Sequence, residues 1–167
     1  GCIFEENSKL YAYNDTYLWI SDGAHFGTKT FVQLMDHSVV SIGRSHFRDK
    51  TILICKAGNL KIGDSGSFAP NLSIMIDDHC EVEIGDEVLV ARNCHIRAGD
   101  GHALFDVKTG KKRNYQSDSD ENRIIIGNHV WIGYNNIILN PSVIGSGCNS
   151  GSGSIIRGDY NNNCSLV

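Results

Sequence analysis

The sequence has few prolines, no long apolar run and no excess of basic charge. Only 2 of its 167 residues are proline. No apolar stretch approaches the roughly 20 residues that a membrane-spanning helix needs. The formal net charge of -4 argues against nucleic acid as the main partner. No stretch has the charged, apolar and small-residue order of a secretory signal. We therefore expect one soluble domain without a membrane span or a nucleic-acid partner.

The cysteines lack any pattern of a metal or redox motif. The 6 cysteines form no CxxC pair, and no cysteine and histidine spacing is typical of a zinc finger. An even number of cysteines would permit disulfides in a secreted protein. Cys94 and Cys148, however, occupy repeat positions that call for a small inward-facing side chain, and a free cysteine packs as a small hydrophobe. We therefore predict reduced cysteines in a cytoplasmic protein.

What the sequence does contain is a repeat of six residues. Isoleucine recurs at Ile126, Ile132, Ile138, Ile144 and Ile156, with Ser150 at the remaining step. The same step joins two earlier groups, which are Ile62, Phe68 and Ile74, and Ile84, Val90 and Ile96. The fifth position of most hexads is small or modest, at Val88, Cys94, Val130, Ser142, Cys148 and Ser154. A helix would need apolar spacings of three and four, and the sequence lacks them.

This period predicts a parallel β-helix, in which three hexads make one coil of 18 residues and each coil stacks its aliphatic side chains on the coil below. Ile-Gly pairs begin at residues 42, 62, 84, 126 and 144, close to the coil period. We assign residues 36–167 to the β-helix domain and expect it to lack its natural C-terminal cap. Residues 1–35 are either degenerate coils or an irregular N-terminal segment.

The repeat stops in the stretch GDGHALFD and resumes at Ile126, which predicts an extended loop at about residues 101–123. The loop opens on Gly101-His102, with Asp100 and Asp106 on either side. A basic cluster and an acidic tail, which includes Asp118, follow. Most polar loops are solvated surface hairpins. Loops longer than about 12–15 residues in a compact domain are more often functional.

The segments GDGHALFD and IIIGNHVWIG resemble the hexapeptide-repeat acetyltransferases. The resemblance is closest to the bacterial capsule and surface-polysaccharide O-acetyltransferases and to the galactoside, maltose and virginiamycin acetyltransferases. It implies a left-handed β-helix, a homotrimer with active sites between subunits, acetyl-CoA as acyl donor, and a sugar or surface glycan as acceptor.

The resemblance also implies roles for single residues. His102 matches the catalytic general base, and Trp131 matches the aromatic residue beside the pantetheine arm of coenzyme A. The backbone N–H of Tyr134 matches an oxyanion donor, and the Ser152 backbone matches a contact to the pantetheine amides. Arg157-Gly158 replaces the Thr-Lys pair that relatives often place near the nucleotide phosphates, so we expect Arg157 to meet a phosphate.

The chemistry supports a histidine at this point independently. Transfer of an acyl group from a thioester to an alcohol requires removal of the hydroxyl proton, and a neutral imidazole suits that task at cellular pH. A carboxylate can hold the imidazole in one tautomer, for which Asp100 and Asp106 are the candidates. Either carboxylate would equally suit binding of acceptor hydroxyls.

Three alternatives compete with sugar O-acetylation. A zinc site like that of the γ-type carbonic anhydrases needs a His-x4-His pair, which the sequence lacks, so we expect no metal. An amino-sugar N-acetyltransferase of similar fold would carry its histidine within a coil. A non-catalytic β-helix would need neither the loop nor Trp131.

His95 is expected to be a wall residue and His129 to lie near the cleft or to be structural. No role is assigned to the remaining histidines, His25, His37, His46 and His79.

Overall fold

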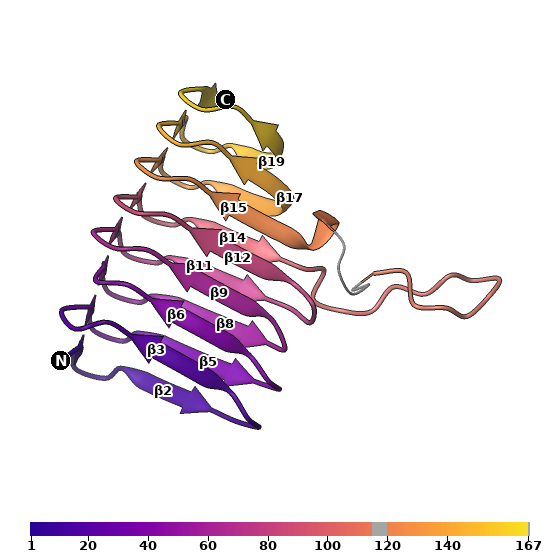
Figure 1. The fold of residues 1–167 in the computed structure, drawn as a ribbon, viewed down its shortest axis with the longest axis horizontal. Helices are drawn as coiled ribbons and strands as arrows, with labels where there is room; N and C mark the ends of the chain where they lie inside the picture. The colour runs from indigo at the N-terminus through magenta and orange to yellow at the C-terminus, as the bar shows by residue number, and fades with distance from the viewer. Residues whose placement is uncertain (115–119, 167) are drawn as a thin grey trace.

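The computed structural model describes residues 1–114 and 120–166 and shows a left-handed parallel β-helix (Figure 1). Every pairing between its strands is parallel, and the one helical segment in the described ranges is a single 3-10 turn, η1 (Asp120–Asn122). The predicted fold is therefore confirmed. None of the described segments forms a helix with the length and apolar character that a membrane crossing requires.

Each coil contributes three strand segments, so the stacked coils form a prism with three faces. Face 1 is the eight-stranded sheet of short strands, which are β1 (Ile3–Phe4), β4 (His25–Phe26), β7 (His46–Phe47), β10 (Ser67–Phe68), β13 (Leu89–Val90), β16 (Trp131–Ile132), β18 (Asn149–Ser150) and β20 (Ser165–Leu166).

Faces 2 and 3 together form the twelve-stranded sheet. Face 2 contains β2 (Lys9–Ala12), β5 (Phe31–Met35), β8 (Ile52–Lys56), β11 (Ser73–Ile76) and β14 (His95–Ala98). Face 3 contains β3 (Tyr17–Ile20), β6 (Val39–Ile42), β9 (Asn59–Ile62), β12 (Glu81–Ile84) and β15 (Arg123–Ile126). The longer strands β17 (Ile137–Ile144) and β19 (Ile155–Tyr160) begin on face 2 and end on face 3, which joins the two faces.

The hexad residues fill the narrow interior of the prism. Ile126, Ile132, Ile138 and Ile144 are at most 1% exposed, as the repeat predicts. Cys94 and Cys148 are buried too, and the six cysteines are unpaired. On face 1 the interior begins as a stack of phenylalanine rings, in which Phe26, Phe47 and Phe68 lie nearly parallel at centroid separations of 4.7 and 4.5 Å. Adjacent coils are therefore held in register by like side chains.

The Ile-Gly pairs mark the corner between faces 3 and 1, where β6, β9, β12, β15 and β17 end. A Cβ atom on Gly127 would lie 2.7 Å from the backbone nitrogen of Ser146 in the next coil, which leaves no room for a side chain. Side chains also bridge the coils here, because Asp64 Oδ1 accepts a hydrogen bond from Arg44 N at 2.6 Å and Asp86 Oδ1 accepts one from Asp64 N at 2.8 Å. These bonds satisfy backbone donors at the sharp corner.

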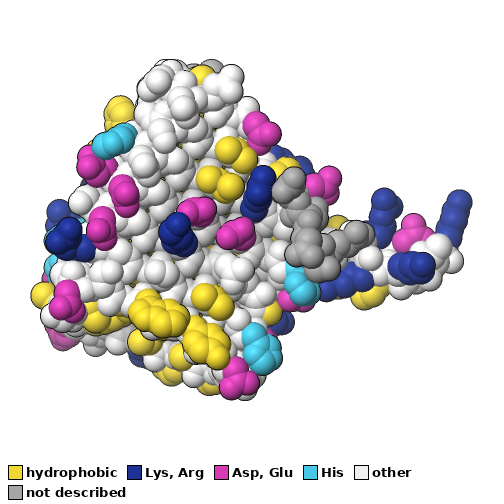
Figure 2. Space-filling model, in the orientation of Figure 1, with side chains coloured by type: hydrophobic (Ala, Val, Ile, Leu, Met, Phe, Trp, Pro, Cys, Tyr) yellow, Lys and Arg dark blue, Asp and Glu magenta, His cyan; other side chains and the backbone are white. Residues whose placement is uncertain are grey.

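Residues 1–35 contain strands β1 to β5, which pair with later coils in the same register as the rest of the stack. The first coil leaves several large side chains exposed, among them Trp19 at 65%. Figure 2 shows an apolar area over the N-terminal coils, with charged side chains above it.

The loop leaves the stack between β14 and β15, at the corner between faces 2 and 3. In Figure 1 it extends to the right, away from the short strands of face 1 at the left. An antiparallel bridge between Phe105 and Lys112 makes its described part a hairpin. Residues 115–119 of the predicted loop, Asp118 included, lie outside the described residues.

Candidate active site

Two side chains from neighbouring coils fix the root of the loop. Asp77, which follows β11, accepts a hydrogen bond through Oδ2 from Gly101 N at 2.6 Å and contacts Arg97 Nη2 at 3.4 Å. Asn140 in β17 accepts a bond from Gly99 N at 2.8 Å and donates one to the Glu121 carbonyl at 2.7 Å. Asn140 thus ties together the point where the chain leaves the coil and the point where it returns.

Asn114 closes the first part of the loop around His102. Its Nδ2 donates to Asp100 Oδ2 at 2.9 Å and to the His102 carbonyl at 2.8 Å. Its Oδ1 accepts a hydrogen bond from Leu104 N at 2.8 Å. One amide therefore holds both chain segments of the hairpin base, and the backbone on either side of the histidine is fixed while its side chain is exposed.

The two candidate carboxylates have different environments. Asp106 Oδ1 accepts three hydrogen bonds, from Lys108 N at 3.0 Å, Thr109 N at 2.8 Å and Thr109 Oγ1 at 3.0 Å. The bonds from Thr109 hold the pKa of the Asp106 carboxyl below its usual value. Asp106 therefore stabilises the turn of the hairpin, whereas Asp100 shares the Asn114 amide with the His102 backbone.

Trp131 stands on face 1, on the opposite side of the chain from the loop. Its side chain is 57% exposed while Ile132 beside it is buried, which agrees with the alternation of a strand. Its register partner Leu89 in the coil below is 49% exposed. The two side chains form an apolar surface next to the corner between faces 1 and 2.

Tyr134 and Ser152 lie in successive turns at that corner. Gly153 N donates to the Tyr134 carbonyl at 2.8 Å, which stacks the two turns. The Tyr134 hydroxyl accepts a bond from Asn93 Nδ2 at 3.0 Å, so the ring is turned toward the coil below. Within the described residues, no acceptor bonds to the backbone N–H of Tyr134.

The candidate residues thus form two groups on one chain. His102, Asp100 and Arg157 lie at the corner between faces 2 and 3, because Arg157 falls where β19 passes from one face to the other. Trp131, Tyr134 and Ser152 lie on face 1 and at the corner between faces 1 and 2. Face 2 separates the two groups, so a single chain does not bring them together.

One further histidine lies close to the loop, because His79 Nε2 is 3.5 Å from Asp78 Oδ1 and Lys112 of the loop lies 3.8 Å from Asp78 Oδ2. His95 points outward from face 2, where its register partner is Ile137, as expected for a wall residue. His129 Nδ1 lies 3.0 Å from Glu87 Oε2 at the corner between faces 3 and 1. Among the described residues, no cluster of three or more His, Cys, Asp or Glu side chains has a geometry that would hold a metal ion.

Sequence patterns alone did not indicate the roles of Asp77, Asn114 and Asn140. Asp77 lies 24 residues before its partner Gly101, and Asn140 lies 41 residues after its partner Gly99, so no local motif joins them to the loop. The coil period is the one available signal, because it places Asp77 directly beneath the residue where the repeat stops.

The fold and the interrupted coil define a class of architecture, the parallel β-helix with an inserted loop. No protein-family profile matches the sequence. A polysialic acid O-acetyltransferase of Escherichia coli O1:K1 is 33% identical over 88 residues, which are 53% of this chain and 27% of that protein. The galactoside O-acetyltransferase of Escherichia coli K12 is 30% identical over 129 residues, which are 75% of this chain and 58% of that protein.

A solved structure agrees with these similarities. The crystal structure of the polySia-specific acetyltransferase NeuO superposes with a TM-score of 0.78 at 29% identity, covering 95% of this chain and 67% of that chain. In both sequence and fold, this chain is similar to these O-acetyltransferases. The chain spans about a quarter of the length of the polysialic acid relative and just over half of the galactoside relative.

Proposed function

We propose that the protein transfers an acetyl group from acetyl-CoA to a hydroxyl group of a sugar or surface glycan, with His102 as general base. The observation that carries the proposal is the way the base of the loop is held. Asp77, Asn114 and Asn140 hold the backbone around His102 while its imidazole is exposed. The relatives named as polysialic acid and galactoside O-acetyltransferases support a hydroxyl acceptor over an amine.

The separation of the two groups of residues supports a site shared between chains. Face 2 carries an outward apolar stripe, which consists of Phe31, Ile52, Ile54, Met75, Ile137, Leu139 and Ile155. Burial of this stripe around a three-fold axis would place the loop corner of one chain against the face 1–2 corner of the next. We therefore propose a homotrimer in which His102 and Trp131 of one site come from different chains.

In this arrangement each residue has a chemical task. The Trp131 ring and Leu89 would cover the pantetheine arm, and the Ser152 backbone would bind its amides. Arg157 would meet a phosphate. An imidazole nitrogen of His102 takes the acceptor hydroxyl proton as the new C–O bond forms. The Tyr134 N–H donates a hydrogen bond to the oxyanion. One such donor commonly stabilises the transition state by about 3–4 kcal/mol. The C–S bond then breaks, and the imidazolium returns the proton to the leaving thiolate.

Asp100 is proposed to orient the imidazole, because it already shares the Asn114 amide with the His102 backbone. We propose that Asp106 shapes the loop, because its Oδ1 already accepts hydrogen bonds from the backbone N–H groups of Lys108 and Thr109. The six unpaired cysteines support the proposed cytoplasmic location, where thiols remain reduced.

A screen for acyl transfer tests the proposal. The protein is incubated with acetyl-CoA and sets of neutral sugars, acidic glycan fragments, amino sugars and nucleotide sugars, and free thiol is measured with a chromogenic disulfide. We expect acceptor-dependent thiol release and an alkali-labile acetyl ester by mass spectrometry. An alkali-stable amide would instead assign N-acetylation. If the protein binds coenzyme A but transfers no acetyl group to any acceptor, it would act as a binding module and not as an enzyme.

A further inference from the structure

The part of the chain that extends farthest from the stacked coils is the hairpin of residues 104–113 (Figure 1). Phe105 and Lys112 form its antiparallel bridge. Asp106 Oδ1 holds the turn through three hydrogen bonds, and Gly110 adopts a φ of 67° there. The tip is therefore preformed, and docking it on another surface would cost little conformational entropy.

The hairpin exposes large apolar side chains. Val107 is 101% exposed, Phe105 61% and Leu104 45%. Val107 begins the turn at the tip, where glycine, asparagine, aspartate and serine are the usual residues and where a β-branched side chain brings no benefit to the turn. Exposed apolar side chains that are gathered together commonly mark an interaction surface. The composition of the tip thus indicates contact with an apolar environment outside the chain.

The same hairpin is basic, although the chain as a whole is acidic. Its formal charge is +3 in a chain of net charge -4, because one carboxylate stands against four basic residues, which are Lys108, Lys111, Lys112 and Arg113. Lys112 lies 3.8 Å from Asp78. Lys108 and Lys111 are exposed, and neither pairs with a carboxylate of residues 1–114 or 120–166. The tip therefore combines apolar surface with positive charge.

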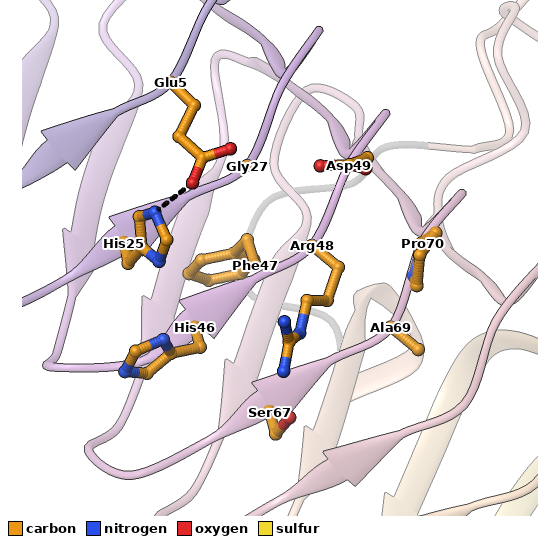
Figure 3. Close-up of a pocket in the computed structure, with 10 residues that line it drawn as sticks. All are labelled: Glu5, His25, Gly27, His46, Phe47, Arg48, Asp49, Ser67, Ala69 and Pro70. Atoms are coloured by element: carbon orange, nitrogen blue, oxygen red, sulfur yellow. Dashed lines mark hydrogen bonds and ion pairs between the residues drawn. The ribbon is translucent and has the colours of Figure 1, made fainter.

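Two other exposed regions lack this excess of positive charge. The recess on face 1 in Figure 3 has a volume of about 530 Å³ and lies over β4, β7 and β10. Two carboxylates, Glu5 and Asp49, line it together with Arg48. The first coil exposes more large apolar side chains than the hairpin, but in residues 1–22 four acidic side chains outnumber Lys9. An anionic surface would therefore be attracted to the hairpin and not to these regions.

We propose that the hairpin docks the protein on an anionic lipid surface. Val107 and Phe105 enter the headgroup region, and Lys108 and Lys111 lie against the lipid phosphates. Peripheral membrane anchors combine these two contributions, because buried apolar area alone or a few charges alone give only weak binding. Salt screens the contribution of the lysines.

The docking surface goes beyond the proposed function, which requires no lipid. The two are nevertheless close together in the chain, since Val107 follows His102 by five residues. Five residues of extended chain span at most about 18 Å. A docked hairpin would therefore hold the histidine of the candidate site near the lipid surface.

Vesicle co-sedimentation of the intact chain, without acetyl-CoA or an acceptor, tests the proposal. The vesicles contain phosphatidylcholine alone or equal parts of phosphatidylcholine and phosphatidylglycerol. We expect binding to the anionic vesicles only, and weaker binding at high salt. The double variant K108Q/K111Q should bind about twentyfold to thirtyfold more weakly, which is about fivefold for each lysine. V107S should bind about threefold to tenfold more weakly. The matched controls are K29Q/K50Q and V39S, which replace exposed side chains on the coils.

Weaker binding in the hairpin variants but not in the controls supports the proposal, whether or not acetyl transfer occurs. The proposal fails if the wild type does not sediment with anionic vesicles at low salt, or if hairpin and control variants lose binding equally. Unchanged binding in V107S would overturn it too, because the contact would then rest on charge alone. If the wild type ignores vesicles and V107S instead loosens the oligomer in light scattering, the hairpin contacts another copy of the chain and the lipid assignment is wrong. Circular dichroism is the folding control, since the hairpin lies outside the stacked coils.

Discussion

The carboxylate of Asp77 accepts a hydrogen bond from the backbone N–H of Gly101 at 2.6 Å, one residue before His102. This contact joins a coil turn to the loop across 24 residues. Gly101 has a φ of 79°, a conformation that glycine adopts without steric cost. The position of the histidine backbone therefore depends on a side chain in the coil below.

Replacement of Asp77 should impair turnover without impairing cofactor binding. D77N replaces the carboxylate acceptor with a weaker amide, so we expect kcat to fall by about tenfold to a hundredfold as His102 shifts. The KM for acetyl-CoA should stay the same. D64N is the matched control, because Asp64 also accepts a backbone bond at 2.6 Å but at a distant corner. Equal kcat losses in both variants would indicate a general effect on the fold.

Trp131→Ala should weaken the binding of coenzyme A. The ring is exposed on face 1, so its loss removes an apolar surface and leaves the interior unchanged. We expect the dissociation free energy to fall by about 1–2 kcal/mol. Titration calorimetry measures this, and light scattering on the same sample reports the assembly state. Trp19→Ala is the matched control, because Trp19 is 65% exposed on face 3. Unchanged affinity in an intact trimer would remove Trp131 from the cofactor site.

Ile137→Glu should dissociate the proposed trimer. Ile137 points outward from face 2 and is 37% exposed in the single chain, so a glutamate is tolerated by the isolated fold but not in a buried interface. Light scattering should give a trimer for the wild type and a monomer for the variant, with loss of acetyl transfer. Val39→Glu on face 3 should remain trimeric. A wild-type monomer at micromolar concentration that still transfers acetyl groups would contradict the shared site.

The sequence predicted the interior more fully than the site. Steps of six identify inward residues such as Ile132, because one geometry repeats in every coil and only a small or aliphatic side chain fits. The first coil lacks this signal, since tyrosine and tryptophan occupy its outward positions and no Ile-Gly pair marks its corner. The loop was visible as a break at His102. Its anchors Asp77 and Asn140 were not, because their contacts depend on the stacking of coils distant in sequence.

Stability at alkaline pH should depend on Cys80, which lies beneath the loop root. Burial raises the pKa of its thiol to about 12 from an ordinary value of 9.0, with further contributions from the charges of Asp77, Asp100 and Asp78. The unfolded chain then releases this proton at lower pH than the folded chain. The stabilising effect is complete below pH 9.0 and is lost as pH rises toward about 12. Denaturant unfolding should therefore show a falling free energy in that window, with a shallower fall in Cys80→Ala. Identical slopes would show that the thiol is not responsible.

The most direct test of the account compares wild type and His102→Ala in acetyl transfer, with coenzyme A affinity measured in parallel. Acceptor acetylation is followed by mass spectrometry at saturating acetyl-CoA. General-base catalysis commonly contributes about 10²–10⁴-fold, so we expect kcat to fall by that factor in His102→Ala while the dissociation constant for coenzyme A stays within twofold or so of wild type. Asp106→Asn is expected to lose less, because Asp106 supports the hairpin turn. Turnover close to wild type in His102→Ala would contradict the proposed mechanism.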